Sequence, residues 1–341
     1  MAITQFSPAD IAIDLGTSSS RVYVRGKGII VNEPSVVAMK AGNSRRGIAV
    51  GEDAEQIAGR SAESVRLVYP IKEGRITDLE TAQLMADYFV NKALGSVRMK
   101  PRIIGLVPLG LTRLEGSMFT NVLNNIGARK QTTIEQVVAG GLGSGLSIYE
   151  PQGSFVVDIG AGKTEIALLS MGGIVVSHSK PVAGMEIDNA IAGYIQREYD
   201  MIITPRTAEQ IKFDLIDIRP GENKDRKVIV RGRDIATGMP TTSDVSLEGV
   251  AGSILKVVNE IIEAIQWALG KTPPELCQDV LRNGIVLCGG TSQLPKLDRM
   301  ISETVGIPVR VAPEAGDSVV LGAGYMADHF DVFSGTASEK E

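Results

Sequence analysis

Two short stretches of the chain have the residue order of a β-hairpin whose turn could bind phosphate. In each, an apolar strand ends in an aspartate and a glycine follows two residues later, Asp14 with Gly16 and Asp158 with Gly160. A glycine turn lets the backbone approach a ligand closely and offers N–H groups to an anion, most often phosphate. Because a carboxylate repels phosphate, its place beside such a turn predicts an intervening cation such as Mg²⁺. For either stretch alone, an ordinary hairpin with an acidic turn is the alternative.

Repetition of the hairpin favours the phosphate-binding interpretation. One copy lies near the start of each half of the chain, over 11–24 and 155–169. Two copies predict two related domains that face each other, and a nucleoside triphosphate held between their turns explains both. Neither turn matches a Walker loop or a dinucleotide fingerprint, so the sequence does not indicate those folds.

Three further groups of residues could face such a ligand. Gln136 stands just past a predicted strand end, where ligand-facing groups lie in α/β sheets. Glu209 and Lys212 are three residues apart on a predicted helix and share a face, although an exposed salt bridge is the simpler explanation. Gly289–Ser292 follow a buried strand and precede a helix, which invites a nucleotide base or sugar, but many βα turns look alike.

Composition narrows the class of protein. At 341 residues the chain has room for about two domains. The formal net charge of −5 argues against nucleic acid as the main partner. Cys277 and Cys288 form neither a metal spacing nor a disulfide framework, and His178 and His329 are too isolated for a metal site. The first ten residues contain neither the basic nor the apolar region of a signal peptide, and no apolar run approaches the ~20 residues that span a bilayer, so we expect a cytoplasmic protein.

Helices and strands alternate between these motifs. Capping residues and apolar spacing predict helix starts at Asp78, at Thr112 and, from a capping-box pattern, at Thr207. Further helices are expected over 139–146, 186–199, 249–269, 317–328 and from 294 onward. The small, polar residues from 334 to 341 are expected to be disordered.

Five stretches together resemble the bacterial actin homologue MreB across nearly the whole chain. They are IAIDLGTSSSRVYVRGKGIIVNEPSVVA, FVVDIGAGKTEIALLSMGGIVVS, TAEQIKFDLI, VRGRDIATGMP and IVLCGGTSQLPKLDRMI. The hairpins are shared by the whole actin superfamily, including sugar kinases and DnaK-type chaperones, whereas VRGRDIATGMP is much narrower. The resemblance implies an α/β, actin-like ATPase fold of two duplicated α/β domains, each with a smaller subdomain, and a nucleotide cleft between them. It divides the chain into subdomain IA (1–31, 67–149 and 320–341), IB (32–66), IIA (150–181 and 246–319) and IIB (182–245).

The same resemblance implies ATP and Mg²⁺ as ligands and gives each motif a role. Phosphate contacts would come from Gly16, Thr17, Ser18 and Ser19 in the first turn and from Gly160, Ala161, Gly162 and Lys163 in the second. Glu209 and Lys212 would reach the ribose, and Gly289, Gly290, Thr291 and Ser292 would border the adenine. The catalytic residues would be Gln136, Asp158 and Asp14, the two aspartates organising Mg²⁺ largely through water.

Two residues depart from the family's usual pattern. Gln136 stands where these proteins usually carry a glutamate that orients the attacking water. Glutamine can orient the water but is no base, so we expect slow hydrolysis and a gain in turnover for Gln136→Glu. Lys163 stands where the second hairpin usually has threonine. It either adds a positive charge near the β- and γ-phosphates or is a solvated turn lysine that points away.

Three functional classes compete within the superfamily. A small-molecule kinase would need a second substrate pocket, and a chaperone would need an appended peptide-binding domain. A cytoskeletal ATPase needs neither, so the sequence favours a slow ATPase that assembles into nucleotide-dependent filaments and serves cell shape or spatial organisation. A specialised filament for positioning organelles or plasmids is the alternative. Morphogenetic proteins are further implied partners, and an anionic membrane surface at the inner face of the cell membrane could be bound through Val97, Met99 or the N-terminus.

Overall fold

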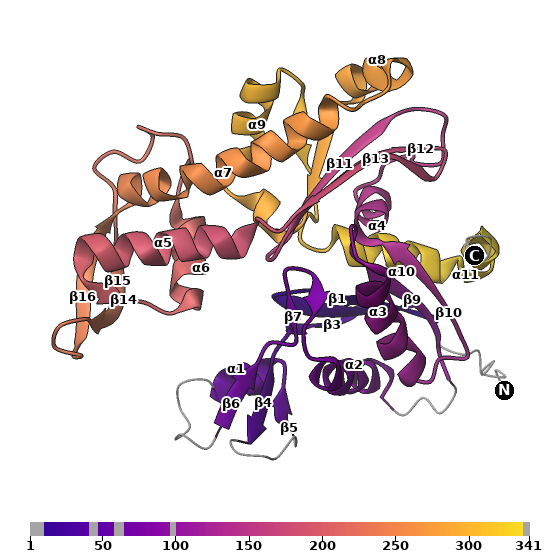
Figure 1. Cartoon of the computed structure of the whole chain (residues 1–341), viewed down its shortest axis with the longest axis horizontal. Coiled ribbons are helices and arrows are strands. Elements are labelled where there is room, and N and C mark those ends of the chain that lie inside the picture. The colour runs from indigo at the N-terminus through magenta and orange to yellow at the C-terminus, as the bar shows by residue number, and fades with distance from the viewer. Residues whose placement is uncertain (1–9, 41–46, 58–64, 96–99, 337–341) are drawn as a thin grey trace, which may run out of the picture. The chain divides into compact units, whose positions relative to one another are not determined.

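The computed structural model of the chain describes residues 10–40, 47–57, 65–95 and 100–336 (Figure 1). Two compact units divide the chain. Unit 1 contains the residues up to Ser147 and those from Asp317 onward, and unit 2 contains Ile148–Gly316. Each unit holds one copy of the predicted hairpin. The finer division into four subdomains stays a prediction of the sequence.

A five-stranded sheet in the order β10-β9-β1-β2-β3 forms the centre of unit 1. The predicted hairpin is its antiparallel pair β1–β2, and β9 and β10 extend the sheet in parallel on the other side of β1. Its strands are β1 (Asp10–Leu15), β2 (Ser19–Val24), β3 (Gly28–Pro34), β9 (Arg102–Val107) and β10 (Lys130–Glu135). Smaller strands form a three-stranded sheet and a short hairpin: β4 (Val37–Lys40), β5 (Gly47–Val50), β6 (Val65–Val68), β7 (Ile71–Lys72) and β8 (Arg75–Ile76).

Two helices of unit 1 begin where local capping signals place them, while α4 begins at Gln136, three residues before the start expected at 139. Asp78 caps α2 by accepting a hydrogen bond from the backbone of Thr81, and Thr112 and Glu115 form a reciprocal capping box at the start of α3. Both predicted starts are therefore confirmed. The helices are α1 (Glu52–Ile57), α2 (Leu79–Leu94), α3 (Arg113–Asn125), α4 (Gln136–Gly143), α10 (Ser318–Asp328) and α11 (Phe330–Thr336).

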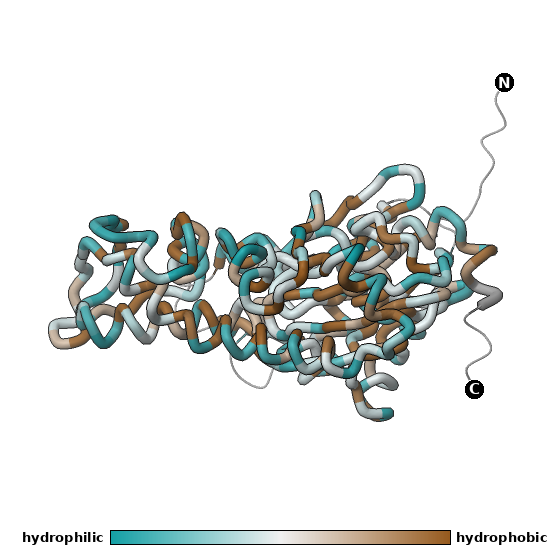
Figure 2. Tube along the Cα trace, turned by 90° about the horizontal axis from the view of Figure 1, so that it is seen from above, coloured by the Kyte–Doolittle hydropathy of each residue, from teal (hydrophilic) through white to brown (hydrophobic). Residues whose placement is uncertain are grey.

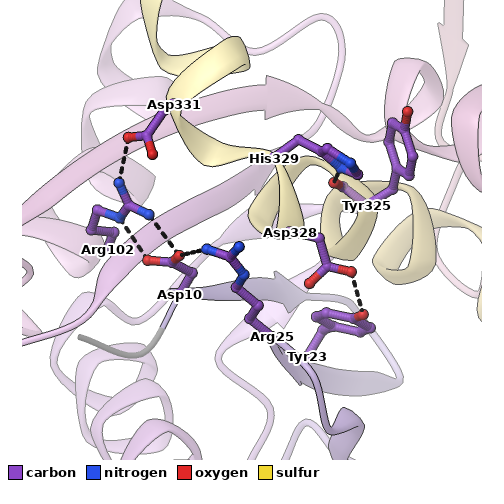
Figure 3. Close-up of polar contacts among 8 residues, drawn as sticks. All are labelled: Asp10, Tyr23, Arg25, Arg102, Tyr325, Asp328, His329 and Asp331. Atoms are coloured by element: carbon purple, nitrogen blue, oxygen red, sulfur yellow. Dashed lines mark hydrogen bonds and ion pairs between the residues drawn. The ribbon is translucent and has the colours of Figure 1, made fainter. Parts of the chain in front are cut away.

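The last helix, α11, is fixed to the sheet of unit 1 by an arginine (Figure 3). Arg102 donates to both carboxylate oxygens of Asp10, each at 2.6 Å, and to Asp331 at 2.5 Å. Its guanidinium carbon lies 4.5 Å from the centre of the buried Phe330 ring. Burial alone would raise the pKa of Asp10, but hydrogen bonds from Arg102 and Arg25 outweigh it and lower that pKa. The expected disorder is wrong for residues 334–336, which are helical, whereas 337–341 lie outside the described residues.

Unit 2 repeats the central sheet of unit 1. Its strand order is β13-β12-β11-β17-β18, with the second hairpin as the antiparallel pair β11–β12 and with β17 and β18 added in parallel. These strands are β11 (Ser154–Ile159), β12 (Thr164–Ser170), β13 (Gly173–Lys180), β17 (Ile285–Cys288) and β18 (Val309–Val311). A separate sheet contains β14 (Met201–Ile202), β15 (Lys227–Asp234) and β16 (Pro240–Ser246). The duplicated motif in the sequence thus belongs to a duplicated fold.

The helices of unit 2 pack with apolar faces against its five-stranded and three-stranded sheets. In α7 the buried residues Val250, Ile254, Val258, Ile261 and Ile265 recur at intervals of three or four. Figure 2 shows such spacing as short hydrophobic and hydrophilic segments that follow one another along the helices. The helices are α5 (Gly184–Tyr199), α6 (Pro205–Asp214), α7 (Leu247–Leu269), α8 (Pro274–Asn283), the 3₁₀ turn η1 (Gly290–Gln293) and α9 (Leu297–Val305).

Four predicted helix starts in unit 2 are wrong by two or three residues, and those at 186 and 249 are observed at Gly184 and Leu247. Helix α6 begins at Pro205 rather than Thr207, because the Thr204 hydroxyl accepts a hydrogen bond from the Thr207 amide and proline fits the first turn. The helix expected from residue 294 begins at Leu297, since the 3₁₀ turn occupies the preceding residues. In the described part of the chain, no helix is long and apolar enough to cross a membrane.

Candidate functional site

The candidate phosphate-binding turn of unit 1 lies between β1 and β2. Ser35 holds this turn, since its hydroxyl donates to the Gly16 carbonyl at 2.7 Å and its amide donates to the Ser18 carbonyl at 2.9 Å. The Thr17 hydroxyl accepts from the Gly74 amide at 3.0 Å. A Cβ at Gly16 would lie 2.5 Å from the Ser19 carbonyl oxygen, so the turn closes this tightly only with glycine. The turn is therefore rigid before any ligand binds.

Asp14 lies buried beside this turn and contacts two side chains. Gln136, the first residue of α4, donates through Nε2 to Asp14 Oδ1 at 2.9 Å. Arg21 faces Asp14 across the β1–β2 pair, and one of its terminal nitrogens lies 3.9 Å from Asp14 Oδ2. Arg21 Nε also donates to Asp317 Oδ1 at 2.8 Å. The structure thus brings Asp14 and Gln136 together and adds Arg21 and Asp317, which the sequence analysis missed.

The candidate phosphate-binding turn of unit 2 lies between β11 and β12, and its carbonyl oxygens face protein donors. The Gly160 carbonyl accepts from the Thr291 hydroxyl at 2.7 Å and from the Gly184 amide at 3.2 Å. The Ala161 carbonyl accepts from the Met185 amide at 2.8 Å. In a trans peptide the N–H points opposite to the C=O. The carbonyls of Gly160 and Ala161 share their peptide bonds with the N–H groups of Ala161 and Gly162, so these two N–H groups point away from the protein donors. That side of the turn can offer N–H groups to an anion.

Lys163 closes this turn and forms an ion pair with Glu165. Both side chains are buried, Glu165 to 1% exposure, so the alternative of a solvated turn lysine is wrong. Glu165 is also the cross-strand partner of Asp158 on β11, so two carboxylates and one ammonium share this end of the hairpin. Whether Lys163 meets phosphate stays a prediction of the sequence.

We expect Lys163→Thr to lower the free energy of unfolding by about 3 kcal/mol, because it leaves the buried Glu165 carboxylate without its ammonium partner. Urea unfolding measures this loss, and Lys163→Thr combined with Glu165→Gln should recover most of it. Titration of the same variants with ATP tests whether Lys163→Thr also weakens nucleotide binding. An undiminished unfolding free energy for the single variant would contradict the ion pair.

Lys212 pairs with a residue that the sequence did not indicate. Its side chain is 2% exposed and its Nζ lies 2.9 Å from Asp188 Oδ1 on α5, whereas Glu209 is exposed. The simpler interpretation of Glu209 and Lys212 as an exposed salt bridge is therefore wrong. Burial raises the pKa of Asp188 above its ordinary value, although the Lys212 ammonium opposes this shift. A Cβ at Gly184 would lie 3.4 Å from Lys212 Nζ, which places the ammonium at the start of α5, beside the second turn.

The glycine-rich segment after β17 supports the second turn. Gly289 has φ +85°, and a Cβ there would lie 2.3 Å from Asp158 Oδ1, so only glycine admits that carboxylate. The Ser292 hydroxyl donates to the Gly289 carbonyl at 2.6 Å, and the Thr291 hydroxyl is already bound to Gly160. Both hydroxyls are thus used inside unit 2, while Gly290 is exposed. A contact with adenine would therefore come from the backbone of this segment.

The model of the MreB/Mbl protein family matches residues 8–334. The chain belongs to this family. It is 38% identical over 323 residues to the cell shape-determining protein Mbl of Bacillus subtilis strain 168, covering 94% of this chain and 96% of that protein. It is 36% identical over 337 residues to the cell shape-determining protein MreB of Escherichia coli K12, covering 97% of each.

Solved structures of actin-like proteins have the same fold. MreB5 of Spiroplasma citri bound to ADP is 31% identical, with a TM-score of 0.89 over 97% of this chain and 99% of that one. The same protein bound to AMPPNP has a TM-score of 0.87. MamK in a double helical filament is 20% identical, with a TM-score of 0.79 over 94% of this chain, and shares the fold. The predicted actin-like fold is confirmed, and the chain is an actin-like cytoskeletal protein of the MreB/Mbl cell-shape family.

The residues of this MreB/Mbl family member fit a nucleotide that carries Mg²⁺. Asp14 and Asp158 are buried carboxylates, each beside a tight turn. Mg²⁺ keeps several waters and takes one or two carboxylates together with phosphate oxygens. The described residues contain no group of three or more His, Cys, Asp or Glu side chains that could hold a metal, so water and phosphate would supply the remaining ligands.

Proposed function

We propose that this MreB/Mbl family member is a slow ATPase that assembles into filaments when it binds ATP. The observation that carries the proposal is the duplicated turn beside a buried aspartate, with backbone carbonyls held by protein donors in both copies. Nucleotide-bound MreB5, at 31% identity, supports ATP as the ligand. The names of the 36–38% identical relatives support a role in cell shape.

The two turns would bind the phosphates of one ATP. The N–H face of Ala161 and the backbone of Thr17 and Ser18 would contact phosphate oxygens. Mg²⁺, when bound, would neutralise charge on the β- and γ-phosphates. Asp158 and Asp14 would hold its water shell, and Lys212 would contact the ribose from the start of α5.

Slow hydrolysis follows from the side chain at position 136. Phosphoryl transfer to water depends on positioning, and a glutamine contributes by fixing the water in line with the γ-phosphate. An amide cannot take up the proton of that water, so the water would attack without a protein base. Turnover would be slow, and ATP-bound filaments would last correspondingly long.

Assembly would follow from a ligand that both units bind. Such a ligand favours one conformation of the chain, and a polymer that selects the same conformation couples nucleotide binding to assembly. The double helical filament of MamK, which shares the fold, supports this expectation. The test is sedimentation across a range of protein and salt concentrations. We expect a pellet with ATP and Mg²⁺ and far less with ADP, whereas monomers under every condition would contradict the proposal.

Location and further partners complete the proposal. We infer a cytoplasmic protein that lies at the inner face of the cell membrane and works with morphogenetic proteins. Val97, Met99 and the N-terminal residues Ile3 and Phe6, the predicted membrane contacts, lie outside the described residues. The membrane contact therefore rests on the sequence pattern of basic residues beside apolar ones.

A further inference from the structure

Four polar side chains of unit 1 form a continuous row between the starts of two helices. Asp317 immediately precedes α10 and binds Arg21 Nε at 2.8 Å. Arg21 approaches Asp14 Oδ2 at 3.9 Å, and Asp14 Oδ1 accepts from Gln136 Nε2 at 2.9 Å. Gln136 is the first residue of α4. Exposure of the side chains falls from 37% at Asp317 through 18% at Arg21 to 8% at Asp14, so the row runs from the surface into the site.

This row fixes which way the Gln136 amide points. A carboxylate has only acceptor atoms, so the group that Gln136 offers to Asp14 must be its NH₂. The carbonyl oxygen of the same amide then lies on the other side of the planar group. A water bound to that oxygen must donate a proton to it, which leaves the lone pairs of the water directed elsewhere and available for attack.

Arg21 is the ion-pair partner of the Asp14 carboxylate. Its guanidinium lies 3.9 Å from Oδ2, while Oδ1 accepts from Gln136, and the bond from Arg21 to Asp317 limits its own movement. Guanidinium groups stay charged throughout the ordinary pH range. Losing Arg21 would therefore remove the positive charge beside Oδ2 and weaken the hold on the carboxylate that accepts from Gln136.

The second hairpin lacks this arrangement. The residue that faces Asp158 across the strand pair is Glu165, whereas the residue that faces Asp14 is Arg21. Glu165 is itself paired with the buried Lys163, so the second hairpin places no cation opposite its aspartate. The two copies of the motif have thus diverged in the residue that faces the aspartate.

We propose that Arg21, acting through Asp14, is a positioning residue for Gln136. This rests on the proposed function, because it presumes that Gln136 orients the water that attacks ATP. The two aspartates that look equivalent in the sequence then differ in one respect. Asp14, beside its place in the water shell of Mg²⁺, also acts on the rate of hydrolysis through Gln136.

A double-mutant cycle on the full-length chain tests this inference. The variants are Arg21→Met, Gln136→Ala and the two combined, and the readouts are ATP affinity with Mg²⁺ and the rate constant of phosphate release at saturating ATP. We expect Arg21→Met to lower that rate constant about 10-fold and to change the affinity by less than about 3-fold. In the Gln136→Ala background, Arg21→Met should have no further effect on the rate, because the group that it positions is gone.

Arg25→Met is the matched control, because Arg25 lies on the turn after the same strand and also binds a buried carboxylate, Asp10, at 2.9 Å (Figure 3). It should lower the unfolding temperature without changing phosphate release. Independent, multiplying effects of Arg21→Met and Gln136→Ala would overturn the inference, as would an equal loss of affinity and rate. Wild type that binds no ATP would overturn the proposed function itself, and the inference with it.

Discussion

Asp158→Ala is expected to abolish Mg²⁺-dependent ATP binding while the chain keeps its fold. Asp158 is the penultimate residue of β11, next to the second turn, and its carboxylate lies over Gly289, where only a residue without a side chain fits. Removing it takes away a carboxylate that would hold the water shell of Mg²⁺, so the affinity for ATP with Mg²⁺ should fall by about 100-fold. Its loss exposes little apolar surface, because the core of unit 2 is built from the neighbouring Phe155, Val157 and Ile159.

Titration with a fluorescent ATP analogue, in Mg²⁺ and again in EDTA, measures this effect. The wild type should bind much more tightly in Mg²⁺, and Asp158→Ala should bind equally weakly in both. Asp244→Ala is the control, since Asp244 is an exposed aspartate on β16 of the same unit. Unchanged affinity and unchanged Mg²⁺ dependence in Asp158→Ala would remove the assignment of Asp158 to the cation.

Gly322→Ala should strongly destabilise unit 1, because α4 and α10 touch backbone to backbone. A Cβ at Gly322 would lie 1.9 Å from the Ala139 carbonyl oxygen, and one at Gly143 would lie 1.8 Å from the Ser318 carbonyl oxygen. The helices would have to move apart to admit the methyl group. Overpacking of this kind costs 1–3 kcal/mol or more, and we expect a loss of about 3 kcal/mol. Because α4 begins at Gln136, the shift should also slow phosphate release.

Urea unfolding of Gly322→Ala and of Gly116→Ala separates packing from helix propensity. Gly116 lies in α3, and a Cβ there would meet nothing within 4 Å. Alanine at that position should stabilise the chain by up to about 1 kcal/mol, since glycine is the poorer helix former. Similar unfolding free energies for the two variants would show that the close contact of α4 and α10 does not limit stability.

Local signals made much of this fold predictable. Asp78 and Thr112 cap their helices through bonds to residues only three positions away, so the sequence alone contains both partners. The two hairpins were predictable for a similar reason, because apolar strands flank a glycine turn within 15 residues or fewer. Their repetition then predicted the duplicated fold.

Contacts between distant residues were not predictable in this way. Lys212 meets Asp188 on a different helix, and Arg21 meets Asp317 almost 300 residues later. The contact of α4 with α10 joins two segments of unit 1 that all of unit 2 separates in the sequence. Pattern and propensity describe single elements, and these pairs depend on how the elements pack.

The contact of Gln136 with Asp14 shows how a pair of distant residues bears on a prediction made from the sequence alone. From the sequence, Gln136→Glu should raise turnover, because a glutamate could accept a proton. In the structure the substituted carboxylate would stand about where an amide nitrogen now lies 2.9 Å from Asp14. Two carboxylates so close stay ionised together only with a cation beside them, and the Mg²⁺ of the nucleotide would supply one. The gain in turnover for Gln136→Glu therefore stays a prediction, and it depends on the bound metal.

Negative-stain microscopy of the purified chain with ATP and Mg²⁺, beside the Asp158→Ala variant under the same conditions, tests the central claim most directly. If the chain polymerises on binding ATP, the wild type should form filaments that disappear when ATP is omitted, and Asp158→Ala should stay monomeric. Wild type that forms no filaments with ATP, or that forms the same filaments without nucleotide and in the variant, would contradict nucleotide-dependent assembly.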